Sequence, residues 1–360
     1  MTRARAAYME WAKTRPRPEI DLVGSNLYAC TLDELPGARD AVDIAGESPD
    51  GYPPLVDAIA RRYGVASDHV ATAGGCSGAN FLACAALLDP GDEVLVESPF
   101  YDPMPAAARL LGASVSTFER RFEDGYDVDV ERVAAAVTSR TRLVLLSNPH
   151  NPSGALARPG SLRALGALAA RRGFHVLVDE VYLDTVFEQR PAPAATISPS
   201  FVSTSSLTKA YGLASLRCGW TLADPEVTQK IRRARDLVDV WAPMPADRLA
   251  VVAFENLDAI AARARAIVET NRGAVDAWLA RRPELVCAPF HATIAFPRLE
   301  GFADASDFAA RLFAETGTAV APGRFFGAPA HFRLAFGGRP DLVTAGLSAI
   351  SSVLDTVAPA

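Results

Sequence analysis

The sequence predicts an α/β protein with a large domain on a mostly parallel sheet and a smaller α+β domain. Between about residues 55 and 203, short apolar runs alternate with helical segments, as in βαβ units whose strands are buried on both faces. Further on, the order changes to one long helix followed by short strands. The 360 residues approach the upper limit for one core, so two domains are expected. We predict a large domain at 46–255 and a small domain from 1–45 and 256–360.

The first 45 residues predict an arm that joins the small domain. Tyr8–Lys13 has the pattern of a short amphipathic helix, which Pro16 stops because proline lacks the backbone donor. A short strand is expected at Ile20–Val23 and a turn at Gly24–Asn26.

The large domain alternates strands and helices. Expected helices are Leu55–Tyr63, Ala79–Leu88, Ala106–Leu111, Val130–Val137 and Leu162–Arg171. Expected strands are Val70–Ala73, Val94–Val96, Ser114–Phe118, Leu143–Leu146, Val176–Val178 and Phe201–Ser203. Sheets of this kind bind ligands beyond the carboxyl ends of their strands.

The C-terminal part predicts one long helix, Asp258–Arg281, which ends before Pro283. Helices also fit Ala305–Thr316 and Pro340–Val357. Short strands are expected around Leu285–Val286, Thr293–Phe296, Ala319–Val320 and Phe332–Phe336.

Composition excludes several classes of protein. Hydrophobic residues make up 49% and charged residues 22%, as in ordinary globular proteins, and the net charge of −6 argues against a general nucleic-acid binder. No run approaches the roughly 20 apolar residues of a membrane span, and the N-terminus lacks a signal-peptide core. The five cysteines form no CxxC pair, which fits reduced thiols in the cytoplasm better than disulfides or a metal site.

Lys209 lies in a stretch of hydroxyl-bearing and small residues, 203–220, in a chain that is otherwise poor in lysine. Ser206 and Thr208 precede it and Arg217 follows. Burial and a nearby cation lower the pKa of an amine, which makes it a nucleophile toward carbonyls. The arginine fork fits a phosphate. The pattern suggests pyridoxal phosphate (PLP), and the alternative is a surface lysine in a Ser-rich loop.

Four further motifs carry candidate chemistry. Gly74–Gly78 joins a strand to a helix, where backbone N–H groups and the helix dipole favour an anion. Ser98–Tyr101 offers an aromatic ring after a strand. Asn148–Gly154 holds two Asn-Pro pairs, whereas a turn needs only one. Val178–Tyr182 ends a buried strand with a carboxylate, which is costly to bury without a cation.

Together these motifs resemble the class I/II aminotransferases, the aspartate-aminotransferase-like family of fold-type-I PLP-dependent enzymes. The resemblance runs from about Leu55 to about Gly337. It implies PLP as the cofactor, an amino acid and a 2-oxo acid as substrates, and a homodimer with sites at the subunit interface.

The resemblance also implies residue roles. Lys209 would hold PLP as an imine and move a proton in catalysis. Arg333, in the Phe332–Gly337 part of the small-domain signature, would grip the substrate carboxylate. Asp179 would pair with the pyridine nitrogen, Ser25 would lie at the substrate mouth with Asn26, and Asn151 would also contact the substrate. The other implied cofactor contacts are Gly75, Cys76, Ser77, Ser206 and Arg217 around the phosphate segment, Tyr101 on the ring face, and Asn151 and Tyr182 at the phenolic oxygen.

Several neighbouring residues are assigned no chemistry. His150 is expected in a wall or at the surface, Glu180 and Asp184 as solvated or structural groups, and Arg324 as exposed or at the rim. One departure concerns the tyrosine that the family usually places before the helix at Leu55, where it reaches the neighbouring subunit's phosphate. Here Tyr52 follows a glycine, which leaves that contact open.

The sequence therefore predicts a PLP-dependent aminotransferase. A first alternative keeps the cofactor and changes the reaction, to a lyase or a ring-forming synthase of a biosynthetic pathway, because these share the same residues. A second alternative is a non-enzymatic regulator on the same fold, which the expected absence of a DNA-binding extension disfavours.

Overall fold

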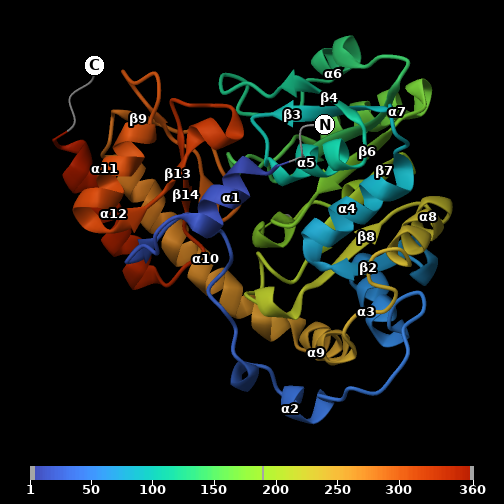
Figure 1. The fold of residues 1–360 in the computed structure, drawn as a ribbon. Coiled ribbons are helices and arrows are strands. Elements are labelled where there is room, and N and C mark those ends of the chain that lie inside the picture. The colour runs from blue at the N-terminus through green and yellow to red at the C-terminus, as the bar shows by residue number, and fades with distance from the viewer. Residues whose placement is uncertain (1–4, 189, 357–360) are drawn as a thin grey trace.

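A seven-stranded sheet forms the centre of the computed structural model, which describes residues 5–188 and 190–356 (Figure 1). The strand order is β2-β8-β7-β6-β5-β3-β4, and β8 runs antiparallel to both of its neighbours while the other pairs are parallel. The predicted α/β class with a mostly parallel sheet is confirmed. The strands are β2 (Val70–Gly74), β3 (Glu93–Ser98), β4 (Ser114–Glu119), β5 (Thr141–Ser147), β6 (His175–Asp179), β7 (Phe201–Ser206) and β8 (Cys218–Leu222).

The central strands are apolar at successive positions because both faces of the sheet are covered. In β5, Leu143 and Leu145 pack into one core cluster, whereas Val144 and Leu146 pack into another. This alternation follows from the two-residue period of a strand. The helices of this part are α3 (Pro53–Tyr63), α4 (Gly75–Leu87), α5 (Pro103–Leu110), α6 (Val130–Ala136), α7 (Pro159–Arg172), α8 (Pro225–Arg235) and α9 (Met244–Glu255).

A long helix, α10 (Leu257–Leu279), leads from α9 to a second unit with its own core (Figure 1). That core includes Trp278, Phe332 and Leu347. Its other elements are β9 (Leu285–Val286), β10 (Ile294–Ala295), β11 (Arg298–Leu299), α11 (Ser306–Thr316), β12 (Thr318–Ala319), β13 (Ala321–Pro322), β14 (Phe332–Ala335) and α12 (Pro340–Leu354). We keep the division into 46–255 and the two flanking segments as a proposal. The predicted helix end Val357 lies outside the described residues.

The N-terminal arm packs against this second unit. Its helix α1 (Ala7–Thr14) is followed by β1 (Ile20–Asp21), which pairs in parallel with β12 through Ile20 and Thr318. The arm then runs beside α10, where Arg263 donates to Tyr28 O at 3.1 Å, and forms α2 (Ala38–Ala41) next to α9 before α3 (Figure 1). Residues near the start of the chain therefore reach the carboxyl end of the large sheet.

Three element predictions need correction. Helix α4 begins at Gly75 and not at Ala79, because the glycine-rich segment is held by tertiary packing: a Cβ on Gly219 would lie 2.3 Å from the Gly75 carbonyl carbon. Strand β8 was not predicted, and its first three residues, 218–220, belong to the lysine stretch. The strand expected at Ala319–Val320 is two short strands, β12 and β13.

Within residues 5–188 and 190–356, no helix is both long and apolar enough to cross a membrane.

Candidate active site

A cavity of about 340 Å³ lies at the carboxyl ends of β6 and β7. Residues from the arm, the large sheet and the second unit line it together. Every predicted site residue except Gly75 belongs to this lining, namely Ser25, Cys76, Ser77, Tyr101, Asn151, Asp179, Tyr182, Ser206, Lys209, Arg217 and Arg333. Gly75 packs directly against Arg217, since an added Cβ would lie 2.3 Å from Arg217 Nη2.

The amine of Lys209 projects into this cavity from the turn after β7. Its Nζ donates hydrogen bonds to Asn26 Oδ1 at 2.7 Å and to Ser25 Oγ at 3.1 Å. Burial, followed by the charge of Arg333, lowers the pKa of the Lys209 amine to about 8. An appreciable fraction of the amine is therefore neutral near pH 8, which is the form that attacks carbonyl groups.

An anion cradle lies at the start of α4, beside Arg217. The first N–H groups of a helix have no partner within the helix, and they carry the positive end of its dipole. Gly75 has a φ of +77°, and its missing Cβ lets the guanidinium of Arg217 approach, with Arg217 Nη2 donating to Gly74 O at 3.0 Å. Ser77 and Ser206 line the same part of the cavity. This donor set fits a phosphate group.

The carboxylate of Asp179 ends β6 and is buried. Asp179 accepts hydrogen bonds from Asn80 Nδ2 at 2.7 Å, from Val181 N at 3.1 Å and from the Cys76 thiol at 3.3 Å. Burial raises the pKa of Asp179, and the Asn80 hydrogen bond opposes that rise. A carboxylate of this kind gains from a cationic partner in the cavity.

The Cys76 side chain points to Asp179 and not into the anion cradle, so its proposed phosphate contact is through the backbone. Its Sγ also lies 3.4 Å from Thr204 Oγ1. Burial raises the pKa of the Cys76 thiol well above its usual value. A thiol held in this neutral form is a poor nucleophile.

The guanidinium of Arg333 is 1% exposed and lies on β14 of the second unit. Its Nη1 donates to Asn151 Oδ1 at 2.9 Å, and its Nη2 donates to Val23 O at 3.0 Å and to the Tyr8 hydroxyl. Among the residues that the structure describes, none accepts a hydrogen bond from its buried Nε. An unpaired buried donor on a cation favours an anionic ligand such as a carboxylate.

Two tyrosines flank the cavity. The Tyr182 hydroxyl donates to Ser25 Oγ at 2.7 Å, and burial raises the pKa of Tyr182 to about 12. The Tyr101 hydroxyl lies 3.3 Å from Met9 Sδ, and its ring meets Tyr8 edge to face with centroids 6.0 Å apart. Both rings lie at the cavity wall, and their contacts with a cofactor stay predictions.

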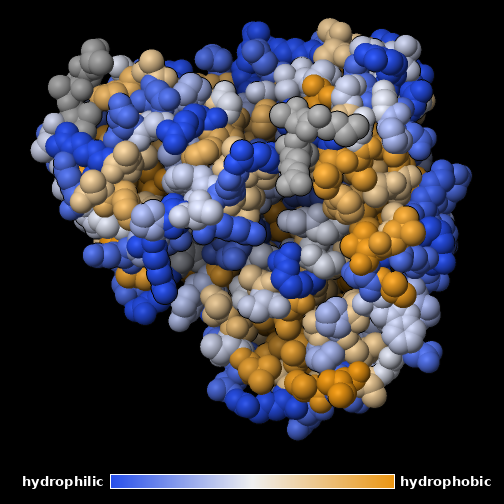
Figure 2. Space-filling view, in the orientation of Figure 1, coloured by the Kyte–Doolittle hydropathy of each residue, from blue (hydrophilic) through white to orange (hydrophobic). Residues whose placement is uncertain are grey.

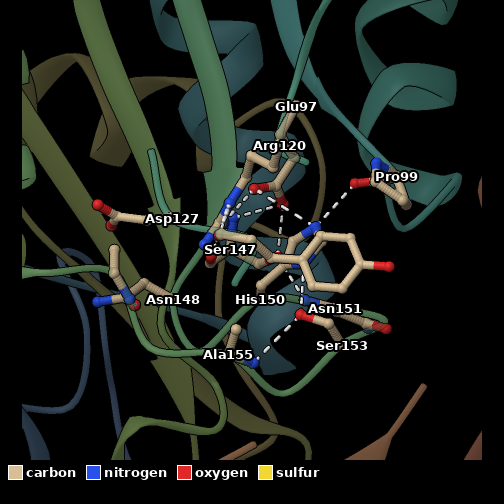
Figure 3. Close-up of polar contacts among 12 residues, drawn as sticks. Glu97, Pro99, Arg120, Asp127, Ser147, Asn148, His150, Asn151, Ser153 and Ala155 are labelled. Atoms are coloured by element: carbon tan, nitrogen blue, oxygen red, sulfur yellow. Dashed lines mark hydrogen bonds and ion pairs between the residues drawn. The ribbon is translucent and has the colours of Figure 1, made fainter. Parts of the chain in front are cut away.

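A buried polar network supports the segment that carries Asn151 (Figure 3). Glu97 Oε1 accepts from Ser147 N at 2.7 Å and from Ser147 Oγ at 2.6 Å, while Glu97 Oε2 accepts from Arg120 Nη1 at 2.6 Å. Asn151 N donates to Ser147 Oγ at 2.8 Å. Burial raises the pKa of Glu97 to about 7. The network fixes the turn that presents the Asn151 side chain to Arg333.

His150 is part of this network and not a surface residue. Its Nε2 lies 2.8 Å from Pro99 O and its Nδ1 lies 2.7 Å from Ser153 Oγ (Figure 3). Burial lowers the pKa of His150 well below its usual value, so it stays neutral. The sequence pattern did not distinguish between a wall position and a surface position for His150. Packing between β3 and β5 places it in the wall.

The remaining neighbours take structural positions. Glu180 is buried and accepts from Ala194 N at 2.8 Å, and Asp184 pairs with Arg62 at 3.3 Å and with Arg190 at 2.5 Å. Both are therefore structural and not solvated. Arg324 is exposed, as expected.

Tyr52 sits at the N-terminus of α3 and does not line the cavity. The guanidinium of Arg248 lies 5.6 Å from its ring centroid.

Sequence reasoning missed several residues of the site. Asn80 was given no role, and neither were Tyr8 and Arg15 of the arm, although these residues line the cavity or hold its residues. Asn80 reaches Asp179 across 99 positions, a separation over which a single sequence gives no signal. Thr208 was noted beside Lys209 in the motif but was assigned no role, and it also lines the cavity.

Comparisons with known proteins agree with this geometry. A model of the family described as Aminotransferase class I and II matches residues 45–350. The chain belongs to this family. The family is PLP-dependent, and the fold and cofactor that the sequence predicted are confirmed.

Individual relatives cover nearly the whole chain. Capreomycidine synthase from Streptomyces vinaceus is 36% identical and aligns with 96% of this chain and 93% of its own length. Aspartate aminotransferase from Streptomyces avermitilis is 28% identical, over 84% of this chain and 80% of its own. Among solved structures, a PLP-dependent aminotransferase from Streptococcus suis superposes with a TM-score of 0.93 at 26% identity, covering 99% of each chain.

The donor set described above fits PLP. The cradle at Gly75 and Arg217 offers N–H donors for a phosphate, Asp179 offers a buried carboxylate, and Lys209 offers an amine of lowered pKa. Arg217, Asp179 and Lys209 all line one cavity, whereas Gly75 is not part of its lining.

We predict that E97Q unfolds more easily than the unmodified protein at pH 8, where Glu97 is ionised. Glutamine keeps the shape but leaves the fully buried Arg120 without its counter-ion, which typically costs about 3–5 kcal/mol of unfolding free energy. Urea denaturation measures the change. E119Q breaks the exposed Glu119–Arg121 pair and is the control, for which little change is expected. Equal effects of both changes would contradict the role given to the network.

Proposed function

We propose that the chain moves an amino group between an α-amino acid and a 2-oxo acid, with PLP held covalently by Lys209. One observation carries this proposal: a lysine whose pKa is lowered to about 8 shares a cavity with the buried Asp179 carboxylate and the buried Arg333 guanidinium. The Lys209 amine suits reaction with a carbonyl group. The Asp179 carboxylate suits a cationic ring nitrogen, and the Arg333 guanidinium suits a substrate carboxylate.

The chain's own residues divide the work of holding the cofactor. Arg217, Ser77, Ser206 and the first N–H groups of α4 would hold the phosphate, and Asp179 would keep the ring nitrogen protonated. Asn151 and Tyr182 would contact the phenolic oxygen, and Tyr101 the ring face. Bound PLP supplies an electron sink for negative charge at the substrate Cα.

Arg333 and Lys209 would act on the substrate itself. Arg333 would bind the α-carboxylate through its unpaired Nε and so orient the Cα–H bond. The free amine of Lys209 would accept the proton from Cα and return it to another carbon, which requires the neutral amine that burial favours.

A ring-forming synthase or lyase is the second candidate function. The observation that favours it is the relative named capreomycidine synthase, at 36% identity over 96% of this chain. The same cavity residues would serve either reaction, because both begin with proton removal at Cα. Product analysis separates the two: an aminotransferase needs a 2-oxo acid as amino acceptor, whereas a synthase or lyase converts the amino acid alone.

We also propose a homodimer in the cytoplasm. Exposed apolar side chains in two segments, 42–44 and 237–241, support the dimer: Ile44 is 86% exposed and Leu237 is 89% exposed. Apolar side chains gather at the lower end of the face drawn in Figure 2, over α2 and α9. Contiguous apolar surface favours association with a partner. The five free cysteines fit a reducing compartment.

Reduction of the PLP-loaded protein with borohydride should attach the cofactor irreversibly to Lys209. The chain has three lysines, Lys13, Lys209 and Lys230, so peptide mapping is unambiguous. The lowered pKa of Lys209 favours its reaction over that of Lys230, which pairs with Glu226 at 3.0 Å. A label on Lys13 or Lys230 would refute the proposed function.

R333A and D179A should fail in different ways. R333A loses a contact present in both ground and transition states, so substrate binding weakens and the rate of proton transfer falls through misalignment. D179A loses a contact that matters most as negative charge develops, so turnover falls far more than affinity. D179A should also shift the absorbance of the bound cofactor, whereas R333A should leave it nearly unchanged.

Single-turnover rates and absorbance spectra of both variants measure these differences. R324A is the matched control, because Arg324 is an exposed arginine of the same unit. It should keep wild-type rates. An unchanged spectrum and rate in D179A, together with loss of cofactor in R333A, would show that both roles are assigned wrongly.

L237D should weaken the dimer by placing a charge in the exposed apolar segment 237–241. Sedimentation velocity at several protein concentrations measures the change. L110D, at another leucine that is 66% exposed, is the control and should leave the assembly unchanged. A fully active wild-type monomer would overturn the proposed dimer.

A further inference from the structure

Two residues of the arm, Ser25 and Asn26, contact the Lys209 amine directly. An ammonium group has three N–H donors, and a carboxamide oxygen and a hydroxyl oxygen both accept. Lys209 Nζ lies 2.7 Å from Asn26 Oδ1 and 3.1 Å from Ser25 Oγ. The two arm residues therefore satisfy two of the donors of the protonated amine.

The backbone of the arm is fixed on both sides of these residues. Tyr28 N donates to Gly337 O at 2.6 Å, and Cys30 N donates to Gly212 O at 3.0 Å. A Cβ on Gly337 would lie 2.7 Å from Asn26 O, and a Cβ on Gly212, whose φ is +72°, would lie 2.5 Å from Tyr28 O. The arm is thus pressed between the turn after β14 and the turn after Lys209, and this packing sets where Asn26 points.

Ser25 joins the amine to the tyrosine of the same site. Its buried Oγ accepts from the Tyr182 hydroxyl at 2.7 Å as well as from Lys209 Nζ. The positions of the Lys209 amine and the Tyr182 hydroxyl are therefore coupled through one side chain.

The charges that face Lys209 come from several elements. Arg333 on β14 and Arg217 oppose the protonated amine, while Asp179 on β6 favours it and the neutral Cys76 thiol on α4 adds no charge. The Tyr182 ring centroid lies 5.9 Å from Lys209 Nζ. Asn26 and Ser25 differ from all of these because they stabilise the ammonium by accepting hydrogen bonds without adding charge.

We propose that Asn26, with Ser25, holds the free amine of Lys209 in place for proton transfer, which makes Asn26 a further catalytic residue. This rests on the proposed function, in which the lysine amine acts while it is not bonded to the cofactor. The Cα–H bond breaks, its electron pair stays on the substrate, and the lone pair of Nζ takes the proton. Asn26 Oδ1 and Ser25 Oγ then accept from the ammonium that forms, and they release it when the proton returns.

The test titrates the Lys209 amine in the cofactor-free protein by NMR, with ¹³C-labelled lysine incorporated so that the amine keeps its three N–H donors. The chain's three lysines give few signals, and Lys230 is an internal control that should not move. From a wild-type pKa of about 8, N26L should lower the pKa of Lys209 by about 1, because a hydrogen bond to a charged group is lost. N26D should raise it, because a carboxylate replaces a neutral acceptor.

A second measurement uses the PLP-loaded enzyme. N26L should lower kcat by about tenfold with little change in KM, since the contact forms with the lysine and not with the substrate. N26D keeps an acceptor oxygen and should retain part of the rate. If N26L fails to fold, S25A and N26D still test the proposal by titration.

An unchanged pKa of Lys209 in the folded Asn26 variants would overturn this inference. The borohydride label on Lys209 is independent of that result. A correct label with an unchanged pKa refutes the role of Asn26 alone, whereas a label on another lysine refutes the proposed function.

Discussion

The guanidinium of Arg333 joins three parts of the molecule, and the site depends on this junction. Arg333 comes from the second unit, its Nη1 binds Asn151 of the large sheet, and its Nη2 binds Val23 O of the arm. A fully buried cation is costly unless it is paired or hydrogen-bonded. Moving either the arm or the Asn151 segment away would leave one buried nitrogen of that cation without its acceptor, so the need to satisfy these donors stabilises the arrangement of the cavity walls.

Burial and neighbouring charges shift the pKa values of the ionisable groups that line the cavity. The Lys209 pKa is lowered because burial and the Arg333 charge outweigh the attraction of Asp179. The Asp179 pKa is raised because burial outweighs its hydrogen bonds. The pKa of each group is thus shifted in the direction that favours its neutral form as long as no charged partner is bound. Groups perturbed in this way and facing one cavity are typical of catalytic sites.

Much of the fold and the site could be predicted because the signals are local. Alternating apolar runs identified the strands of the large sheet, and paired motifs at strand ends identified Lys209, Asn151 and Asp179. Prediction failed where a residue's environment comes from far along the chain. Helix α4 begins at Gly75 because Gly219 leaves room for it. Asn80 belongs to the site because β6 brings Asp179 to it.

By itself the sequence determined the α/β class, the PLP chemistry and the residue types of the site. These could be predicted because strand periodicity and short motifs depend only on residues that are close together in the sequence. Only the tertiary structure decided that His150 is a buried wall residue, that the Cys76 thiol faces Asp179, and that the arm reaches Lys209. Those outcomes depend on which buried donor finds which acceptor. That choice is made when distant segments pack, and no local pattern encodes it.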